Sequence, residues 1–280
     1  RWGDLESILL ERMERASDAD ERVQLGFRLS MLLEESLGRV DDACQVMKDL
    51  HYLNPEREEV VDQLRRFFDN DVREEETLGI LDGYYRGKDA WGDVARILEG
   101  RLDVASDSDD RLDICRQLAG IAKDNLGDLD AALRWTGEVV VLDPEDEGAL
   151  TRLKDLGREL GQLEEVASFV ERAASQAEMD DTRIRLDLEA GWILSRELND
   201  LERAELFFLE ALDRDPEQPD ALEALDDLYG GQDRHEEQEK MLTRRAENAQ
   251  YPEQQVELLM RLGRLRENSL GDAESAIGAY

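Results

Sequence analysis

Three stretches of this chain share one pattern: LGRVDDACQVMKDLHYLNP at 37–55, LGDLDAALRWTGEVVVLDP at 126–144 and LNDLERAELFFLEALDRDP at 198–216. In each stretch a Pro follows the opening Leu by 18 residues, and an Ala follows that Leu by six. A fourth stretch begins at Leu270-Gly271 and carries Ala276 at the same spacing. Self-similarity at fixed spacing is the signature of a repeat architecture, in which each unit buries its core against its neighbours.

A second motif precedes each of these stretches by 35 residues. It reads WGDLESIL at 2–9 and WGDVARIL at 91–98, with weaker copies that begin at Leu163 and His235. The copies at 91, 163 and 235 are 72 residues apart, whereas the first two are 89 apart. The chain therefore contains four copies of one period, and the first copy is 17 residues longer than the others.

Each period predicts four amphipathic helices, because its apolar residues recur at helical spacing. In the second copy these helices fall at about 91–105, 111–125, 130–142 and 147–159. Gly127 followed by Asp128 suits the end of one helix and the start of the next. Asp143-Pro144 suits an N-cap followed by Pro in the first turn. Short polar links between helices imply that neighbouring helices run antiparallel.

The repeat resembles the tetratricopeptide repeat (TPR) family. Half of the 72-residue period is close to that family's unit of 34 residues, and Ala204, Phe208, Ala211 and Pro216 fall where the family places small, aromatic, small and Pro residues. The resemblance, to a bacterial type with a 72-residue double repeat, covers nearly the whole chain. It implies an all-α fold, a right-handed α-solenoid of antiparallel helix pairs with about 16 helices. We expect residues 1–280 to form one continuous array within a longer protein.

The 17 additional residues of the first copy lie between Pro55 and Trp91. An apolar helix pattern occurs twice there, around 57–69 and 74–86. We therefore expect an inserted helix around 57–73, which changes the parity of an up-down array. The chain must bend, form a three-helix unit or extend one long helix through the break. The insertion is either a hinge or partner-specific wall, or a tolerated local duplication.

The charge balance restricts the classes of partner. Asp and Glu number 70 against 35 Lys and Arg, which gives a net charge of −35. This field repels nucleic-acid phosphates and anionic membranes, and it favours basic partners. Salt adaptation of an acidic bacterial protein is the alternative explanation for the charge. No apolar run is long enough to span a membrane, and Cys44 and Cys115 suit buried small residues.

Motifs that carry chemistry are missing from the sequence. The two histidines, His51 and His235, have no Cys or His at ligand spacing, so no metal site is expected. We expect no enzyme activity and no cofactor, and a small-molecule ligand is disfavoured. The resemblance instead implies a protein-protein interaction scaffold that binds a peptide or helix of another protein, and the charge argument favours a basic one. The sequence does not name the compartment, although a cytoplasmic location is favoured. The alternatives are a regulatory or targeting arm of a larger enzyme whose catalytic domain lies outside this segment, and a structural subunit that stacks end to end.

In this family the first helix of each pair lines a concave groove. Matching the copies assigns the groove to helices at about 21–36, 111–125, 147–159, 182–197, 219–230 and 253–268. Aromatic and Met side chains on such a surface suit capture of a peptide or helix. Trp192 and Phe27 could alternatively pack between neighbouring helices. The predicted groove-facing residues are Phe27, Met31, Arg116, Lys123, Arg185, Leu188, Trp192, Asp220, Glu223, Asp227, Met260 and Arg264.

Overall fold

The computed structural model describes residues 2–70, 72 and 74–280, and every regular element in that part of the chain is helical. These residues form sixteen α-helices and four π-helical segments, η1 to η4, so the chain is all-α as predicted. By their contacts the helices fall into two compact units, residues 1–126 and 127–280.

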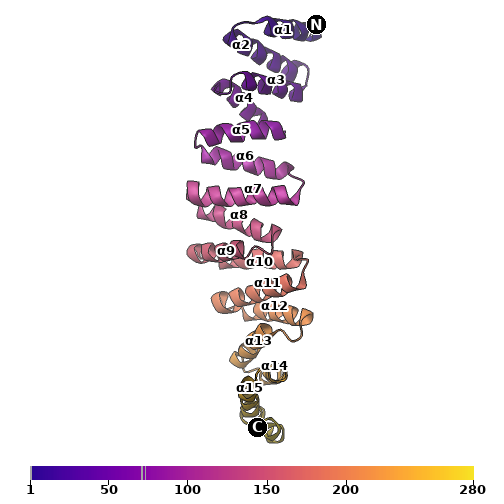
Figure 1. Ribbon diagram of the computed structural model, residues 1–280, viewed down its shortest axis with the longest axis vertical. Helices are drawn as coiled ribbons and strands as arrows, with labels where there is room; N and C mark the ends of the chain where they lie inside the picture. The colour runs from indigo at the N-terminus through magenta and orange to yellow at the C-terminus, as the bar shows by residue number, and fades with distance from the viewer. Residues whose placement is uncertain (1, 71, 73) are drawn as a thin grey trace. The chain divides into compact units, whose positions relative to one another are not determined.

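Successive helices within the first unit pack against one another as antiparallel neighbours (Figure 1). The elements of this unit are α1 (Trp2–Arg15), α2 (Ala19–Met31), η1 (Leu32–Ser36), α3 (Val40–Leu53), α4 (Glu58–Asp69), α5 (Glu75–Gly87), α6 (Trp91–Val104), α7 (Ser108–Gly120) and η2 (Ile121–Leu126).

The second unit repeats the same succession without the additional helix. Its elements are α8 (Leu129–Leu142), α9 (Glu147–Leu160), α10 (Leu163–Gln176), α11 (Asp180–Trp192), η3 (Ile193–Leu198), α12 (Leu201–Arg214), α13 (Pro219–Gly231), α14 (His235–Glu247), α15 (Pro252–Leu265), η4 (Arg266–Leu270) and α16 (Ala273–Ala279).

The alanines that recur in the sequence motifs lie where neighbouring helices pack closely together. The four matching alanines, Ala43, Ala132, Ala204 and Ala276, are at most 2% exposed. A larger residue at these positions would hold two helices apart, because protein interiors are packed without spare volume. Cys44 and Cys115 are also buried, in agreement with the sequence prediction.

Of the two Asp residues predicted to begin helices, one does so. The side chain of Asp128 caps α8 by accepting a hydrogen bond from the Ala131 amide, at 3.0 Å. The prediction that Asp143 caps the next helix is wrong: Asp146 caps α9, accepting from the Ala149 amide at 2.8 Å. Asp143 ends α8 instead, because a residue before Pro is held in an extended conformation and Pro144 lies in the turn.

The inserted pattern forms two helices, α4 and α5, and both bury apolar residues. α4 covers most of the inserted helix predicted around 57–73, of which residues 71 and 73 lie outside the described part of the chain. α3 contacts α4, and α4 contacts α5. α3 also reaches α5 directly: the buried Lys48 ammonium lies 2.6 Å from Glu74 and 2.9 Å from Glu76. The hydroxyl of Thr77 lies 3.4 Å from the Cys44 sulfur. α3 is therefore in contact with α4 and, through these side chains, with α5.

π-helical segments end the same helix in all four copies. η1, η2, η3 and η4 follow α2, α7, α11 and α15 and lead into the Leu-Gly or Leu-Asn turn. The residue after the Leu has positive φ in every copy: 66° at Gly38, 66° at Gly127, 56° at Asn199 and 69° at Gly271. Positive φ favours Gly and tolerates Asn, which explains the residue choice at this turn.

Candidate binding surface

In the first unit the predicted groove residues lie on two helices that are separated along the chain by α3 to α6. Met31 at the end of α2 is 56% exposed, whereas Phe27 on the same helix is half-buried. Arg116 on α7 and Lys123 on η2 are exposed. Of the predicted groove residues in this unit, Met31 is therefore the exposed large apolar side chain.

In the second unit α11 supplies three of the predicted residues. The Arg185 guanidinium donates a 2.7 Å hydrogen bond to the Pro144 carbonyl and so links α11 to the turn before α9. Trp192 is partly buried, and the Arg196 guanidinium lies 5.3 Å from the centre of its ring. Leu188 is 4% exposed, so its prediction as a groove-facing residue needs correction.

Leu188 is enclosed because α11 is packed on more than one side. Seven residues of this 13-residue helix are buried, among them Leu186, Asp187 and Leu188 in succession. Three consecutive residues of an α-helix point in directions spread around much of its circumference. Leu188 therefore contributes to the core of the second unit rather than to a binding surface.

The remaining predicted residues lie on α13 and α15, and these two helices are in contact. Asp220, Glu223 and Asp227 of α13 are exposed, as are Met260 and Arg264 of α15. The contact is made by Asp226, a fully buried carboxylate whose Oδ2 lies 3.0 Å from the Arg261 guanidinium of α15.

Asp226 also pairs with Arg245 of α14 and accepts a 3.0 Å hydrogen bond from the Gln238 amide. Arg245 in turn lies 3.3 Å from Glu223. A buried carboxylate is tolerated only when it is paired and hydrogen-bonded, as here. The buried ion pairs of Asp226 therefore hold α13 against α14 and α15, while the acidic residues on its other face remain exposed.

An equivalent contact joins α9 and α11 with the signs of the charges reversed. The Lys154 ammonium of α9 lies 2.7 Å from Glu189 of α11. Positions 154 and 189 are each 72 residues before Asp226 and Arg261. Sequence reasoning missed these residues, although opposite charges at matching positions of two copies are a readable signal.

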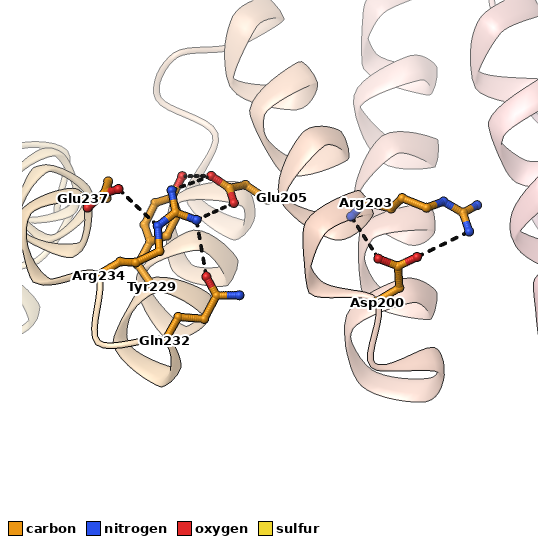
Figure 2. Close-up of polar contacts among 7 residues, drawn as sticks. All are labelled: Asp200, Arg203, Glu205, Tyr229, Gln232, Arg234 and Glu237. Atoms are coloured by element: carbon orange, nitrogen blue, oxygen red, sulfur yellow. Dashed lines mark hydrogen bonds and ion pairs between the residues drawn. The ribbon is translucent and has the colours of Figure 1, made fainter.

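A polar cluster links α12, α13 and α14 (Figure 2). Arg234 makes a bidentate pair with Glu205, at 2.5 and 2.9 Å, and its guanidinium lies 4.4 Å from the Tyr229 ring centre. The Tyr229 hydroxyl donates to Glu205 at 3.0 Å, and Glu237 accepts from the Arg234 Nε at 3.1 Å.

The pKa shifts in this cluster follow from its contacts. Hydrogen bonding to Arg234 lowers the pKa of Glu205, and burial raises the pKa of Tyr229 to about 12. The Glu205 carboxylate is therefore held ionised and the Tyr229 phenol protonated, which suits a fixed clamp between helices rather than proton transfer.

The described residues contain no group of three or more His, Cys, Asp or Glu that could hold a metal ion. Burial raises the pKa of the Cys44 thiol, which opposes formation of a reactive thiolate. Among the same residues, no helix has the length and apolar character needed to cross a membrane.

No family model matches the sequence, and no curated protein sequence matches it. Solved structures that are similar include MamA, with 17% identity and a TM-score of 0.36 over 60% of this chain and 87% of that one. PilF of Pseudomonas aeruginosa has 16% identity and a TM-score of 0.37 over 74% and 89% of the two chains.

A third similar structure is the C-terminal part of a TPR repeat-containing protein from Cytophaga hutchinsonii. It has 11% identity and a TM-score of 0.39 over 83% of this chain and 92% of that one. Similarities at this level transfer no property of those proteins to this chain, whose fold follows from its own helices and repeats.

Proposed function

We propose that this chain is a non-catalytic scaffold that binds a peptide or helix of another protein along the first helices of its repeats. The observation that supports this most directly is a contrast between two kinds of repeat position. The position of Ala43, Ala132, Ala204 and Ala276 is invariant and buried. The position of Met31, Gly120, Trp192 and Arg264 holds four chemically unrelated residues.

A position that packs the same way in every copy should stay apolar and of similar volume. The varied position does not, and its members are not buried: Met31 is 56% exposed, Arg264 is exposed and Trp192 is partly exposed. Because packing does not restrict the residue type at a solvent-facing position, the residue there can be suited to binding a partner. Trp is the residue most enriched among side chains that dominate binding energy.

The acidic α13 face supports a basic partner. Asp220, Glu223 and Asp227 are exposed along one helix, and the net charge of −35 adds a field that accelerates association with cations. Nucleic acid is disfavoured by the same field, since its affinity depends on neutralising phosphates with Lys and Arg.

The test is Trp192→Ala in a binding measurement with a protein partner captured by the intact array. We expect the substitution to weaken binding by about 2 kcal/mol or more, as for an anchor residue, measured by isothermal titration calorimetry. The cost to folding should be well below the ~3–5 kcal/mol of truncating a buried aromatic residue.

Phe208→Ala is the matched control, because Phe208 is only 1% exposed. It should unfold the protein at much lower denaturant and spare binding under conditions where the fold survives. If Trp192→Ala destabilises the fold as much as Phe208→Ala, Trp192 belongs to the core and the groove assignment fails. Recovery of no protein partner by the array would argue against the scaffold role itself.

A further inference from the structure

Two repeat positions that cap helices in the first unit carry large apolar residues in the second. Asp18 and Asp107 precede α2 and α7, and their side chains accept hydrogen bonds from the Glu21 and Asp110 amides. The matching residues before α11 and α15 are Met179 and Tyr251, which provide no side-chain cap.

The backbone at these positions would accept an Asp. Its φ and ψ are −89° and 130° at Asp18, and −91° and 132° at Met179. Loss of the cap lowers helix stability, and neither replacement is compensated by burial: Met179 is 54% exposed and Tyr251 is 68% exposed. Both residues therefore carry a cost to folding that packing does not explain.

Cavities lie near both of these turns. One of about 390 Å³ is formed between the turn before α9 and the turn before α11, and Met179 is part of its wall. A second, of about 200 Å³, lies between α13 and the turn before α15; its lining includes Gln250 and the cationic Arg245 but not Tyr251. Both are lined at matching repeat positions, among them Glu145 and Glu217, and Ala177 and Ala249.

The first cavity is lined by both apolar and acidic residues. Val141 and Ala177 of its lining are buried, whereas Met179 is exposed. Two exposed carboxylates, Glu145 and Glu178, line it, and no Lys or Arg is part of its lining. Such a site fits an apolar side chain flanked by cationic ones, because the carboxylates attract the cations while the apolar lining takes up the apolar group.

We propose that this edge of the second unit docks a basic amphipathic segment of a partner protein, with an apolar side chain against Met179 and arginine or lysine heads on Glu145 and Glu178. The proposal rests on the scaffold function and adds a second contact surface, apart from Trp192.

The test uses an amidated peptide in which Leu and Arg alternate, a matched peptide with citrulline in place of Arg, and the full 280-residue protein. The readout is ¹³C-methyl NMR of the six methionines. We expect the Met179 signal to shift saturably with the Arg peptide, while the buried Met47 and Met241 stay unchanged. The citrulline peptide should bind roughly tenfold more weakly, because its side chain carries no charge.

Glu145→Gln combined with Glu178→Gln should weaken binding of the Arg peptide roughly fivefold, since two exposed ion pairs are lost. Glu159→Gln combined with Glu202→Gln is the matched control: both residues are exposed and the net charge changes equally. Equal weakening by the two variants would show that the peptide follows the general field, and would overturn the proposal.

Met179→Asp separates binding from folding. It should restore the cap seen at Asp18 and Asp107 and so raise the melting temperature. It should nevertheless weaken binding of the Arg peptide roughly tenfold, although it adds a negative charge. A lower melting temperature or unchanged affinity of this variant, or an unmoved Met179 signal in the unsubstituted protein, would overturn the proposal. If the peptide titration fails, the docking edge at Met179 is ruled out and binding through Trp192 is unaffected. If the array captures no protein partner, the scaffold function is ruled out, and the peptide titration can still be evaluated by itself.

Discussion

Glycines within the helices differ sharply in what surrounds them. A Cβ added at Gly191 would overlap the ring of Phe208, and one added at Gly263 would lie 2.8 Å from Tyr280. These pairs occupy matching positions of two copies, so a small residue on one helix and an aromatic on the next form a repeated packing device. On α5, by contrast, a Cβ added at Gly79, Gly83 or Gly87 would meet nothing within 4 Å.

Gly191→Ala should therefore destabilise the protein by about 1–3 kcal/mol, because the Phe208 ring must move within a packed interior. Gly83→Ala is the control with the opposite expected sign, a gain of about 0.5–1 kcal/mol from lower backbone entropy in a helix. Urea unfolding of both variants measures the difference. If Gly191→Ala were neutral or stabilising, the contact with Phe208 would not constrain the packing of α11.

Asp187 gives the second unit a pH-dependent contribution to stability. This carboxylate is 2% exposed, and burial raises its pKa from 3.8 to about 6 despite Arg214, whose guanidinium lies 3.0 Å away. A pKa that is higher in the folded state means that the folded protein binds this proton more tightly. The resulting stabilisation is fully present below pH 3.8 and is lost as pH rises through about 6.

Asp187→Asn removes this titration and leaves the other ionisable groups in place. The unfolding free energy of the wild type, minus that of Asp187→Asn, should rise by up to ~3 kcal/mol as pH falls from ~7 to ~4. Chemical denaturation at a series of pH values gives the difference directly. A difference that does not vary with pH would show that the Arg214 pair holds Asp187 ionised throughout.

At the scale of elements, helix positions were predictable and helix types were not. The predicted helix at 111–125 covers α7 together with η2, and that at 182–197 covers α11 with η3. Apolar periodicity locates a helix from its buried face. Over the five or six residues of a π segment, however, the same apolar pattern fits an α-helical turn and a π-helical turn. The sequence therefore does not distinguish the two helix types.

The candidate site was predictable where equivalent residues of the repeats occupy equivalent positions on their helices. Matching the repeats predicted Met31, Glu223 and Arg264 as groove-facing; all three are exposed, and the groove itself stays a prediction. It failed at Leu188, because burial of that residue depends on how closely helices pack around α11, which repeat spacing does not specify. The contact between Asp226 and Arg261 was likewise not predicted, since it joins helices that are not consecutive in the chain.

The turn after each π segment offers a test of this element. Asn199 has a φ of 56°, whereas the matching residues are glycines. Asn199→Gly should raise the unfolding free energy by up to ~1 kcal/mol, and Gly127→Ala should lower it by ~1 kcal/mol, because a Cβ disfavours positive φ. Thermal and urea unfolding report both changes. Loss of stability in Asn199→Gly would mean that the Asn side chain itself supports the turn.

At the scale of the whole molecule, the imbalance between acidic and basic residues is the dominant feature. That the repeats form one continuous array across both units stays a prediction. Many arginines are already paired between helices, as Arg172 is with Glu138 at 3.1 Å and Arg158 with Glu197 at 2.7 Å. Even if every one of the 35 basic residues were matched to one carboxylate, half of the 70 acidic residues would have no basic match. Their mutual repulsion favours expansion of the chain.

Screening should therefore stabilise the fold. The Debye length falls from ~30 Å at 0.01 M to ~3 Å at 1 M monovalent salt, which removes repulsion between distant carboxylates and leaves close pairs less affected. We expect the melting temperature to rise across this range, and to rise similarly in potassium chloride and choline chloride if screening alone is responsible. A rise confined to one cation would indicate specific binding. A flat or falling melting temperature in both salts would show that the ion pairs between helices already balance the field, because their loss on screening would then offset the relief of repulsion.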